Sequence, residues 1–457
     1  MKNSFYAKIG FIFLLILTLL IPRAFLSDLV SERQQWREGA YNSIQQSWPG
    51  DQIIAGPLLV IPYQLTVITK ENVTSSAPKN TKSKIITKEE TINSKLYVTP
   101  KKLTINSQVE SSIRSRGIYG IPVYNSQSAV QGEFDFQHIK DITEEFKGKK
   151  LVWGKPYLSV LVSDQRGIAA PPSLKWGSAN LAFLPGSQLP GTENGMYAKL
   201  PVINHLQEQS ITFSFNLELK GMRSVSFALL SDDTTIKLSS NWASPSFTGE
   251  LLPDQRVIND QGFTAQWRAS SFSYNTAGVL QACADGQCSR LLEKSVGFAL
   301  IQPVDVYQQS ERSVKYALLF ITLTFVVLIL LELLKKLRIH PIQYTLVAMA
   351  LLVFYLLLIS FSEHIVFLYA YTIGTVASTL LLTVYFGAIL SSTTLGFALG
   401  GGLSAIYSAL YVILQAEDTA LLMGSVLIFV VLALLMLLTR NLDWYELTKQ
   451  NKPISEG

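Results

Sequence analysis

The chain has 457 residues, of which 48% are hydrophobic and 16% are charged, and its formal net charge is +5. This length and a charged fraction well below the soluble average of about 25% argue against a single compact soluble domain. Much of the positive charge lies beside apolar segments or in one Lys/Thr-rich stretch. It therefore indicates membrane orientation rather than nucleic-acid binding.

The N-terminal apolar segment, Ile9–Leu26, follows a basic start that contains Lys2 and Lys8. A basic start and a short apolar core fit either a cleaved signal peptide or an uncleaved signal anchor. Bulky Phe25 and Leu26 stand where a cleavage site would need small residues. We therefore favour an anchor over residues 1–26 that remains attached as a transmembrane helix.

Residues 27–50 predict an amphipathic linker helix that leaves the membrane. Apolar side chains recur at helical spacing from Leu29 to Ile44, with charged and amide side chains between them. The sequence Trp48-Pro49-Gly50 predicts the end of this helix.

Residues 51–316 predict a large, mostly β domain, built as a sandwich or as two small sheets. The segment Ile211–Lys220 alternates apolar and polar residues, which is typical of a half-buried strand. Lys70–Glu90 is rich in Lys, Thr, Ser and Asn, and predicts a loose loop or an exposed hairpin. Further strands are predicted at Val98–Glu110, Ala129–Phe136, Tyr157–Val162, Val225–Leu230 and Thr234–Ser240.

The sequence predicts six transmembrane helices, five of them in a C-terminal bundle over residues 317–440, followed by a tail over residues 441–457. Each is long enough to cross a hydrocarbon core of about 30 Å at a rise of about 1.5 Å per residue. The six segments are Ile9–Leu26, Ala317–Leu334, Ile342–Phe361, Ile365–Tyr385, Leu395–Leu414 and Leu421–Thr439.

The basic turn between the second and third segments predicts the orientation. It contains Lys335, Lys336 and Arg338, and Lys and Arg accumulate in cytoplasmic loops. With six segments, the basic residues at both chain ends fall on the same side, and the opposite turns are acidic or neutral. We therefore expect both termini in the cytoplasm and residues 27–316 in the periplasm.

Cys283 and Cys288 are the two cysteines of the chain. Thiols are oxidised outside the inner membrane, and Ala-Asp-Gly-Gln between them can turn tightly. We expect a local disulfide rather than two free thiols. The spacing does not match a Cys-x-x-Cys redox motif.

No catalytic, cofactor-binding or metal-binding motif is recognisable. The four histidines include His340 and His364, which the predicted orientation places at opposite membrane faces. Few ionisable groups lie within the spans, which disfavours an ion pump. Gly396 and Gly400 form a GxxxG pattern that predicts close helix packing, although a broken helix at a substrate site is the alternative.

The chain resembles the family of the inner membrane protein CreD, also called the cell envelope integrity family, over nearly its whole length. Segments from the N-terminal half that carry the resemblance are Ser31-Glu32-Arg33, Gly56–Tyr63, Arg116-Gly117-Ile118-Tyr119 and Ser163–Ile168. Segments from the C-terminal half are Pro245-Ser246-Phe247, Pro303-Val304-Asp305, Lys315-Tyr316-Ala317, His340-Pro341 and Ser362-Glu363-His364.

The resemblance implies a bacterial inner membrane protein that is induced by an envelope-stress regulator and contributes to envelope integrity. No biochemical activity is established for the family, so the resemblance supplies no catalytic residues. The sequence itself predicts no cofactor and does not indicate an oligomeric state. Relatives often carry His before Pro-Ser-Phe, where this chain has Ser244, which puts any metal or pH role of that position in doubt.

Three functions remain open from the sequence. The first is a non-enzymatic protein that senses or braces the envelope through its periplasmic domain. The second is a transporter or channel for an envelope-related substrate that uses the C-terminal helices, and the third is an envelope enzyme. Expected partners are the lipid bilayer and periplasmic envelope components or other membrane proteins, with no nucleic acid.

Overall fold

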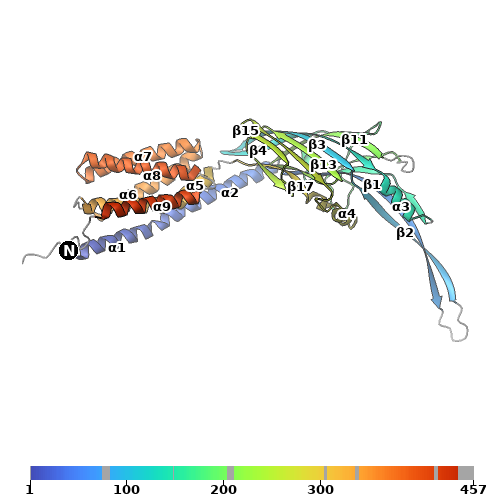
Figure 1. Cartoon of the computed structure of the whole chain (residues 1–457), viewed down its shortest axis with the longest axis horizontal. Coiled ribbons are helices and arrows are strands. Elements are labelled where there is room, and N and C mark those ends of the chain that lie inside the picture. Colours follow the sequence, from blue (N-terminus) through green and yellow to red (C-terminus); the bar gives the residue numbers. More distant parts are fainter. Residues whose placement is uncertain are drawn as a thin grey trace, which may run out of the picture. The chain divides into compact units, whose positions relative to one another are not determined.

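A computed structural model describes residues 2–74, 83–147, 149–202, 210–302, 306–334, 339–415 and 420–440. The chain forms two compact units. Met1–Gly39 and Val304–Gly457 make a helical unit, and Ala40–Pro303 make a unit that we call the β unit (Figure 1).

The helices of the helical unit are long and apolar. They are α1 (Lys2–Thr18), the first part of α2 (Leu20–Gln45), α5 (Val306–Leu334), α6 (Pro341–Ser362), α7 (Phe367–Ile389), α8 (Thr393–Gln415) and α9 (Ala420–Thr439). Among the described residues, five segments are long and apolar enough to cross a membrane, and the first of them combines α1 and α2. The predicted sixth segment falls on α9, whose described apolar stretch is shorter. The predicted multi-pass helical architecture with an inserted β domain is confirmed.

Helices α1 and α2 follow each other with little interruption. Pro22 has no N–H to donate to the carbonyl of Thr18, and the two helices divide at Leu19. The ladder nevertheless continues, because Leu19 N donates to Leu15 O at 2.9 Å and Arg23 N donates to Leu19 O at 3.2 Å. The predicted linker helix is thus part of α2, and it ends at Gln45, a few residues before Trp48.

The two glycines of the GxxxG pattern face α7. A Cβ atom on Gly400 would overlap the side chain of Thr383, and one on Gly396 would lie 2.8 Å from Gly387 Cα. Glycine therefore allows α8 to approach α7 more closely than any other residue would.

The β unit contains two sheets. Among the described residues, sheet A has nine strands, β1 (Gln52–Thr74), β2 (Ser83–Val98), β5 (Lys150–Trp153), β6 (Tyr157–Val162), β9 (Leu184–Pro185), β10 (Gly195–Lys199), β12 (Ser224–Ala228), β14 (Pro245–Gly249) and β17 (Ser295–Leu300). Sheet B has eight described strands, in the spatial order β15 (Gln255–Asn259), β16 (Gly262–Ser270), β13 (Asp233–Ser240), β3 (Lys102–Arg116), β4 (Tyr119–Asp135), β11 (Ser210–Met222), β7 (Ser173–Trp176) and β8 (Ala179–Ala182). Most pairs are antiparallel, but β1 pairs with β12 and β3 pairs with β13 in parallel.

The two sheets pack face to face around one apolar core, as in a β-sandwich. Because side chains alternate along a strand, Phe213, Phe215 and Leu217 of β11 point into this core while the residues between them point outward. Phe263 of sheet B and Phe298 of sheet A meet edge to face, with ring centroids 4.6 Å apart. Aromatic pairs of this kind add to the area-dependent stability of the core.

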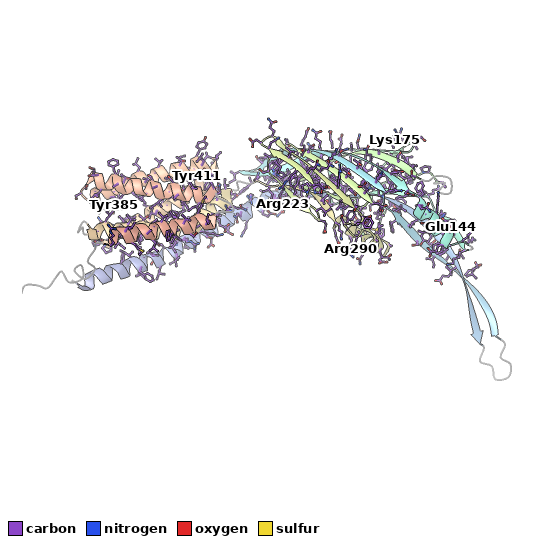
Figure 2. All side chains as sticks on the ribbon, viewed as in Figure 1. Glu144, Lys175, Arg223, Arg290, Tyr385 and Tyr411 are labelled. Atoms are coloured by element: carbon purple, nitrogen blue, oxygen red, sulfur yellow. A yellow bond between two sulfur atoms is a disulfide. The ribbon has the colours of Figure 1, made fainter. Side chains whose placement is uncertain are left out.

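The outer faces of the two sheets differ. The outer face of sheet A is covered by α4 (Thr276–Ala284) and the short helix η2 (Cys288–Leu292), which bury a second apolar cluster. Figure 2 shows Arg290 of η2 on that side of the β unit and Lys175 of β7 on the opposite side, where sheet B lies. The outward residues of sheet B are mainly polar, and several are exposed.

The strand predictions differ from the structure mainly at the ends. The predicted Ile211–Lys220 lies within β11, and Tyr157–Val162 coincides with β6. The predicted Val98–Glu110 is divided, because Val98 ends β2 and β3 begins at Lys102, after Pro100. A proline cannot donate to a strand ladder, so it favours such a break.

The Lys/Thr-rich stretch forms a hairpin in its described part. β1 and β2 pair from Leu59 with Val98 out to Thr74 with Ser83. Of the two predicted alternatives, the strand pairing of the described residues fits the hairpin rather than the loop.

We expect Gly400→Leu to lower the stability of the full-length protein by about 2 kcal/mol, because overpacking would separate α7 from α8. Thermal unfolding in detergent measures this effect. Gly401→Leu is the matched control, since a Cβ on Gly401 meets no atom within 4 Å. Equal melting temperatures for the two variants would contradict close packing of α7 and α8 at Gly400.

Candidate functional site

The C-terminal end of α2 is held in the β unit by a set of residues that we call the joint: Tyr41, Trp48, Asp51, Asp164, Arg166 and Arg223. The last carbonyls of a helix have no partner within the helix and need donors from elsewhere. Nη1 of Arg166 donates to Gln45 O at 3.1 Å and to Gln46 O at 3.3 Å. One arginine therefore satisfies two carbonyls at the end of α2.

Asp164 fixes the position of that arginine. Its carboxylate accepts from Arg166 Nε at 3.0 Å and from Arg166 Nη2 at 2.6 Å, which is a bidentate pair. It also accepts from the backbone N–H of Gly50 at 3.0 Å. The neighbouring Gly167 leaves no space for a Cβ, which would overlap the side chain of Gln52. The segment Ser163–Ile168 thus ties the end of α2 to the start of β1.

Aromatic side chains of the joint lie beneath arginines. The guanidinium of Arg114 lies 4.0 Å from the ring centroid of Trp48, and that of Arg223 lies 3.9 Å from the ring centroid of Tyr41. Nε1 of Trp48 donates to Gly221 O at 3.0 Å. These cation–π contacts hold the helix end against the ends of β4 and β11, two interior strands of sheet B. A small apolar cluster also contributes, formed by Tyr41, Ile44, Ile121, Val123 and Met222.

The two carboxylates of the joint are perturbed in opposite directions. Burial raises the pKa of Asp51, although Arg223 and hydrogen bonds oppose this shift. The hydrogen bond from Arg166 lowers the pKa of Asp164. Asp164 is therefore ionised at neutral pH, as its pairing with Arg166 requires.

A second feature is a band of polar side chains on the outer face of sheet B, which we call the polar platform. It consists of two rows that cross neighbouring strands. The strand registers give one row as Val257, Thr264, Ser239, Gln108, Gln127 and Glu218. They give the other row as Gln255, Gln266, Lys237, Asn106, Ala129 and Asn216.

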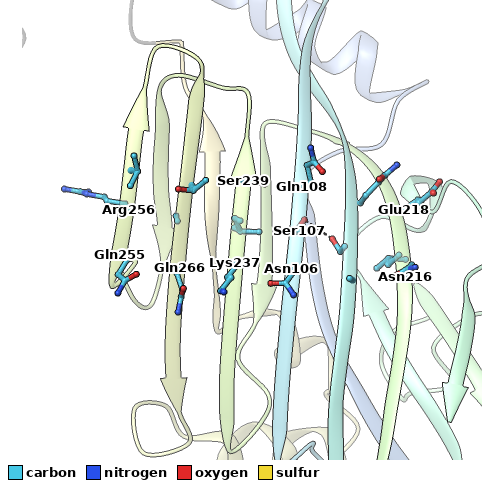
Figure 3. Close-up of a pocket in the computed structure, with 18 residues that line it drawn as sticks. Asn106, Ser107, Gln108, Asn216, Glu218, Lys237, Ser239, Gln255, Arg256 and Gln266 are labelled. Atoms are coloured by element: carbon cyan, nitrogen blue, oxygen red, sulfur yellow. Dashed lines mark hydrogen bonds between the residues drawn. The ribbon is translucent and has the colours of Figure 1, made fainter. Parts of the chain in front are cut away.

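The polar platform is hollowed rather than flat. A shallow cavity of about 710 Å³ lies over both rows. Figure 3 shows Gln255, Gln266, Lys237 and Asn106 side by side on neighbouring strands. Beneath the platform, Ser107, Ser126 and Ser128 are buried and hydrogen-bond to one another at 2.9–3.2 Å, so these inward hydroxyls are satisfied.

The two cysteines lie on the other side of the β unit. The structure joins Cys283 of α4 and Cys288 of η2 by a disulfide, and both are fully buried in the cluster that covers sheet A. The bond therefore links α4 to η2, the two helices that cover sheet A, and it is remote from the outer face of sheet B.

The structure describes only some of the other residues that the sequence analysis singles out. Lys335, Lys336 and Arg338 lie outside the described residues. His340 begins α6, where its Nδ1 accepts from Ile342 N at 3.3 Å. Among the residues that the structure describes, no group of His, Cys, Asp and Glu could hold a metal ion.

The sequence alone predicts neither the joint nor the platform. Ser163–Ile168 carries the family resemblance but no local sign of its role, which requires Arg166 to meet Gln45, 121 residues away. The platform leaves a clearer signal in the sequence. Asn106, Gln108 and Asn216 occupy outward positions in strands whose residues alternate between buried and exposed. An excess of amides at such positions could have revealed it.

Comparisons with known proteins agree over nearly the whole chain. The family model described as "Inner membrane protein CreD" matches residues 4–445. The protein of that name from Escherichia coli (strain K12) is 30% identical over 446 residues, which are 97% of this chain and 95% of the relative. Among solved structures, the β-barrel of the InvG secretin domain from the Salmonella SPI-1 injectisome covers 37% of this chain and 62% of its own, at 8% identity and a TM-score of 0.07. A TM-score this low does not indicate a shared fold, so nothing about this chain follows from it.

We expect Arg166→Met to destabilise the protein by about 1 kcal/mol at pH 7, because the α2 carbonyls and Asp164 lose their partner. The folded-state pKa of Asp164 is lowered, so this contribution is present above pH 3.8 and is lost as the pH falls through the folded-state value. The destabilisation should therefore shrink in acid.

Chemical unfolding of the full-length protein at pH 7 and at about pH 3 measures both effects. Arg256→Met on the exposed strand β15 is the control and should change stability little at either pH. If Arg166→Met were neutral at pH 7, the joint would not be held as described.

Proposed function

Because this chain belongs to the CreD family of inner membrane proteins, we propose that it contributes to cell-envelope integrity and to the envelope stress response as a non-enzymatic protein. It is a multi-pass protein of the inner membrane. In this proposal the β unit senses or braces envelope components, and α2 connects it to the membrane.

The joint is the observation that carries this proposal. A sensing or bracing domain transmits force or movement only if the element that leaves it is held firmly. Arg166, Asp164 and Trp48 hold the end of α2 by hydrogen bonds to backbone groups rather than by side-chain packing alone.

The same helix is also tied within the helical unit. Arg33 of α2 pairs with Glu363 at the end of α6, with Nε 3.3 Å from Oε1. Further down, Nε of Arg23 donates to Val314 O of α5 at 3.2 Å. Since α2 is one continuous helix over Leu20–Gln45, it is suited to connect the two units mechanically.

The proposed orientation places the β unit in the periplasm and both termini in the cytoplasm. Basic residues support it, because Lys2 and Lys8 precede the first span and Arg440 follows the last. The buried disulfide of the β unit also fits an oxidising compartment.

Polar groups of the platform support a binding role rather than catalysis. The carboxamides of the platform do not ionise near neutral pH and are therefore poor general acids or bases. They can hydrogen-bond to a ligand as donors and as acceptors.

Transport by the helices is a second candidate, and buried hydroxyls favour it. The hydroxyls of Thr375 and Thr379 of α7 are buried, and Thr379 Oγ1 has no hydrogen-bond partner in the described structure. Thr375 lies beside Tyr371, whose hydroxyl donates to Tyr407 O at 2.7 Å. Unpartnered polar atoms inside a membrane bundle can mark a substrate path.

Replacing both threonines by Val, which keeps their shape, separates the two candidates. If the bundle brings a polar substrate past α7, Thr375→Val with Thr379→Val should abolish complementation of a deletion strain. The bracing proposal predicts that a deletion strain carrying this double variant survives detergent and β-lactam as well as one carrying the wild-type protein.

We expect Gly39→Pro to reduce envelope integrity in a deletion strain that is complemented with the variant. Proline inside a helix removes a hydrogen bond and costs about 3 kcal/mol, so it would interrupt α2 where the two units meet in the sequence. Survival in detergent and β-lactam measures the effect.

Gly39→Ala at the same position is the matched control, because a Cβ there meets no atom within 4 Å and alanine favours the helix. Membrane levels of both variants are measured by immunoblot. Full complementation by Gly39→Pro at normal levels would rule out mechanical connection through α2.

A further inference from the structure

The amides of the polar platform are available to a ligand. None of the hydrogen bonds between described residues uses the side chains of Asn106, Gln108, Gln127 or Asn216, and all four are exposed. They come from three adjacent strands, β3, β4 and β11, and line the same cavity (Figure 3).

The composition of the platform differs from that of an ordinary solvated sheet face. Asparagine is depleted in β-strands, yet Asn106 and Asn216 occupy the middle of β3 and β11. Charged residues lie towards both ends of these strands. Lys102 lies opposite Glu133 and Asp233 at one end, and Glu110 and Lys220 flank Asn125 towards the other. The amides lie between these charges, over the cavity.

The charges that line the cavity favour a neutral ligand. They are Lys237, Arg256 and Glu218, so the lining carries a net charge of only +1 from its two cations and one anion. An anionic polymer would need a cluster of Lys or Arg to compensate its desolvation. Amides and hydroxyls instead match a ligand that offers both donors and acceptors without charge.

An extended peptide fits this surface less well. Peptides that add to sheets do so at an edge, where backbone N–H and C=O groups are unpaired. Here β3 and β4 are interior strands whose backbone groups are paired on both sides. The ligand must therefore be recognised by side chains alone.

We propose that the polar platform binds a neutral, polyhydroxylated chain, namely an uncharged stretch of envelope glycan, which lies across β13, β3, β4 and β11. This inference rests on the proposed function and specifies what the β unit recognises. The hydroxyls and acetamido groups of such a glycan pair with the amides of Asn106, Gln108, Gln127 and Asn216.

Titration of the full-length protein in nanodiscs tests the proposal. The probe is a hexasaccharide of β-1,4-linked N-acetylglucosamine, and microscale thermophoresis measures its binding. We expect saturable binding that weakens at least about tenfold, or ~1.4 kcal/mol, in the double variant Asn106→Leu with Asn216→Leu.

Asn180→Leu is the matched control. Asn180 is an exposed amide on β8 of the same sheet, opposite Lys175, but it does not line the cavity. This variant should bind as the wild type does. Thermal unfolding and size-exclusion chromatography verify that all variants are folded.

The salt dependence of binding tests the charge of the ligand. Binding of the neutral hexasaccharide should change by less than about twofold between about 0.05 M and about 0.5 M NaCl, because salt screens charges and a neutral ligand does not depend on them. Dextran sulfate is the anionic probe. Tighter binding of dextran sulfate than of the hexasaccharide, weakened by salt, would overturn the proposal. Absence of saturable hexasaccharide binding, or unchanged binding by the double variant, would also overturn it.

The outcome is distinguishable from a failure of the proposed function. If the wild type does not bind the hexasaccharide while Gly39→Pro still impairs the envelope, the glycan inference fails and bracing stands. If the platform binds glycan as described but Gly39→Pro complements fully, bracing through α2 fails and the binding site stands.

Discussion

The structure depends on how the end of α2 is terminated. A helix that leaves the membrane and enters a folded domain presents unpaired carbonyls at its last turn, and these must be satisfied if the chain is to continue in one direction. Arg166 satisfies the carbonyls of Gln45 and Gln46, and Asp164 holds both Arg166 and Gly50. This ion pair and Trp48 therefore hold the last turn of α2 within the β unit.

The two outer faces of the β unit differ in what covers them. α4, η2 and the buried disulfide cover sheet A, so that face contributes to stability. No described helix covers the middle strands of sheet B, where amides surround a shallow cavity. The proposed binding of an envelope glycan uses the polar face and leaves the covered face to stabilise the fold.

The sequence predicts those features that arise from local periodicity. The alternation of Ile211–Lys220 identifies β11, and long apolar runs identify α5 to α8, because both patterns depend on neighbouring residues. The joint could not be derived, since Arg166 meets Gln45 only after two sheets have formed. The platform likewise depends on strand order, because Asn106 and Asn216 are neighbours only through β4, and parallel pairing of β3 with β13 leaves no local signal.

Hydrogen–deuterium exchange of the full-length protein in nanodiscs tests most directly whether α2 is held at its end. If the joint is formed as described, the backbone amides of residues 40–48 exchange as slowly as those of the central strands β3 and β11, and Arg166→Met accelerates their exchange selectively. Rapid exchange of residues 40–48 in the wild type, at the rate of exposed helix ends, would contradict a firm connection and with it the proposed bracing role.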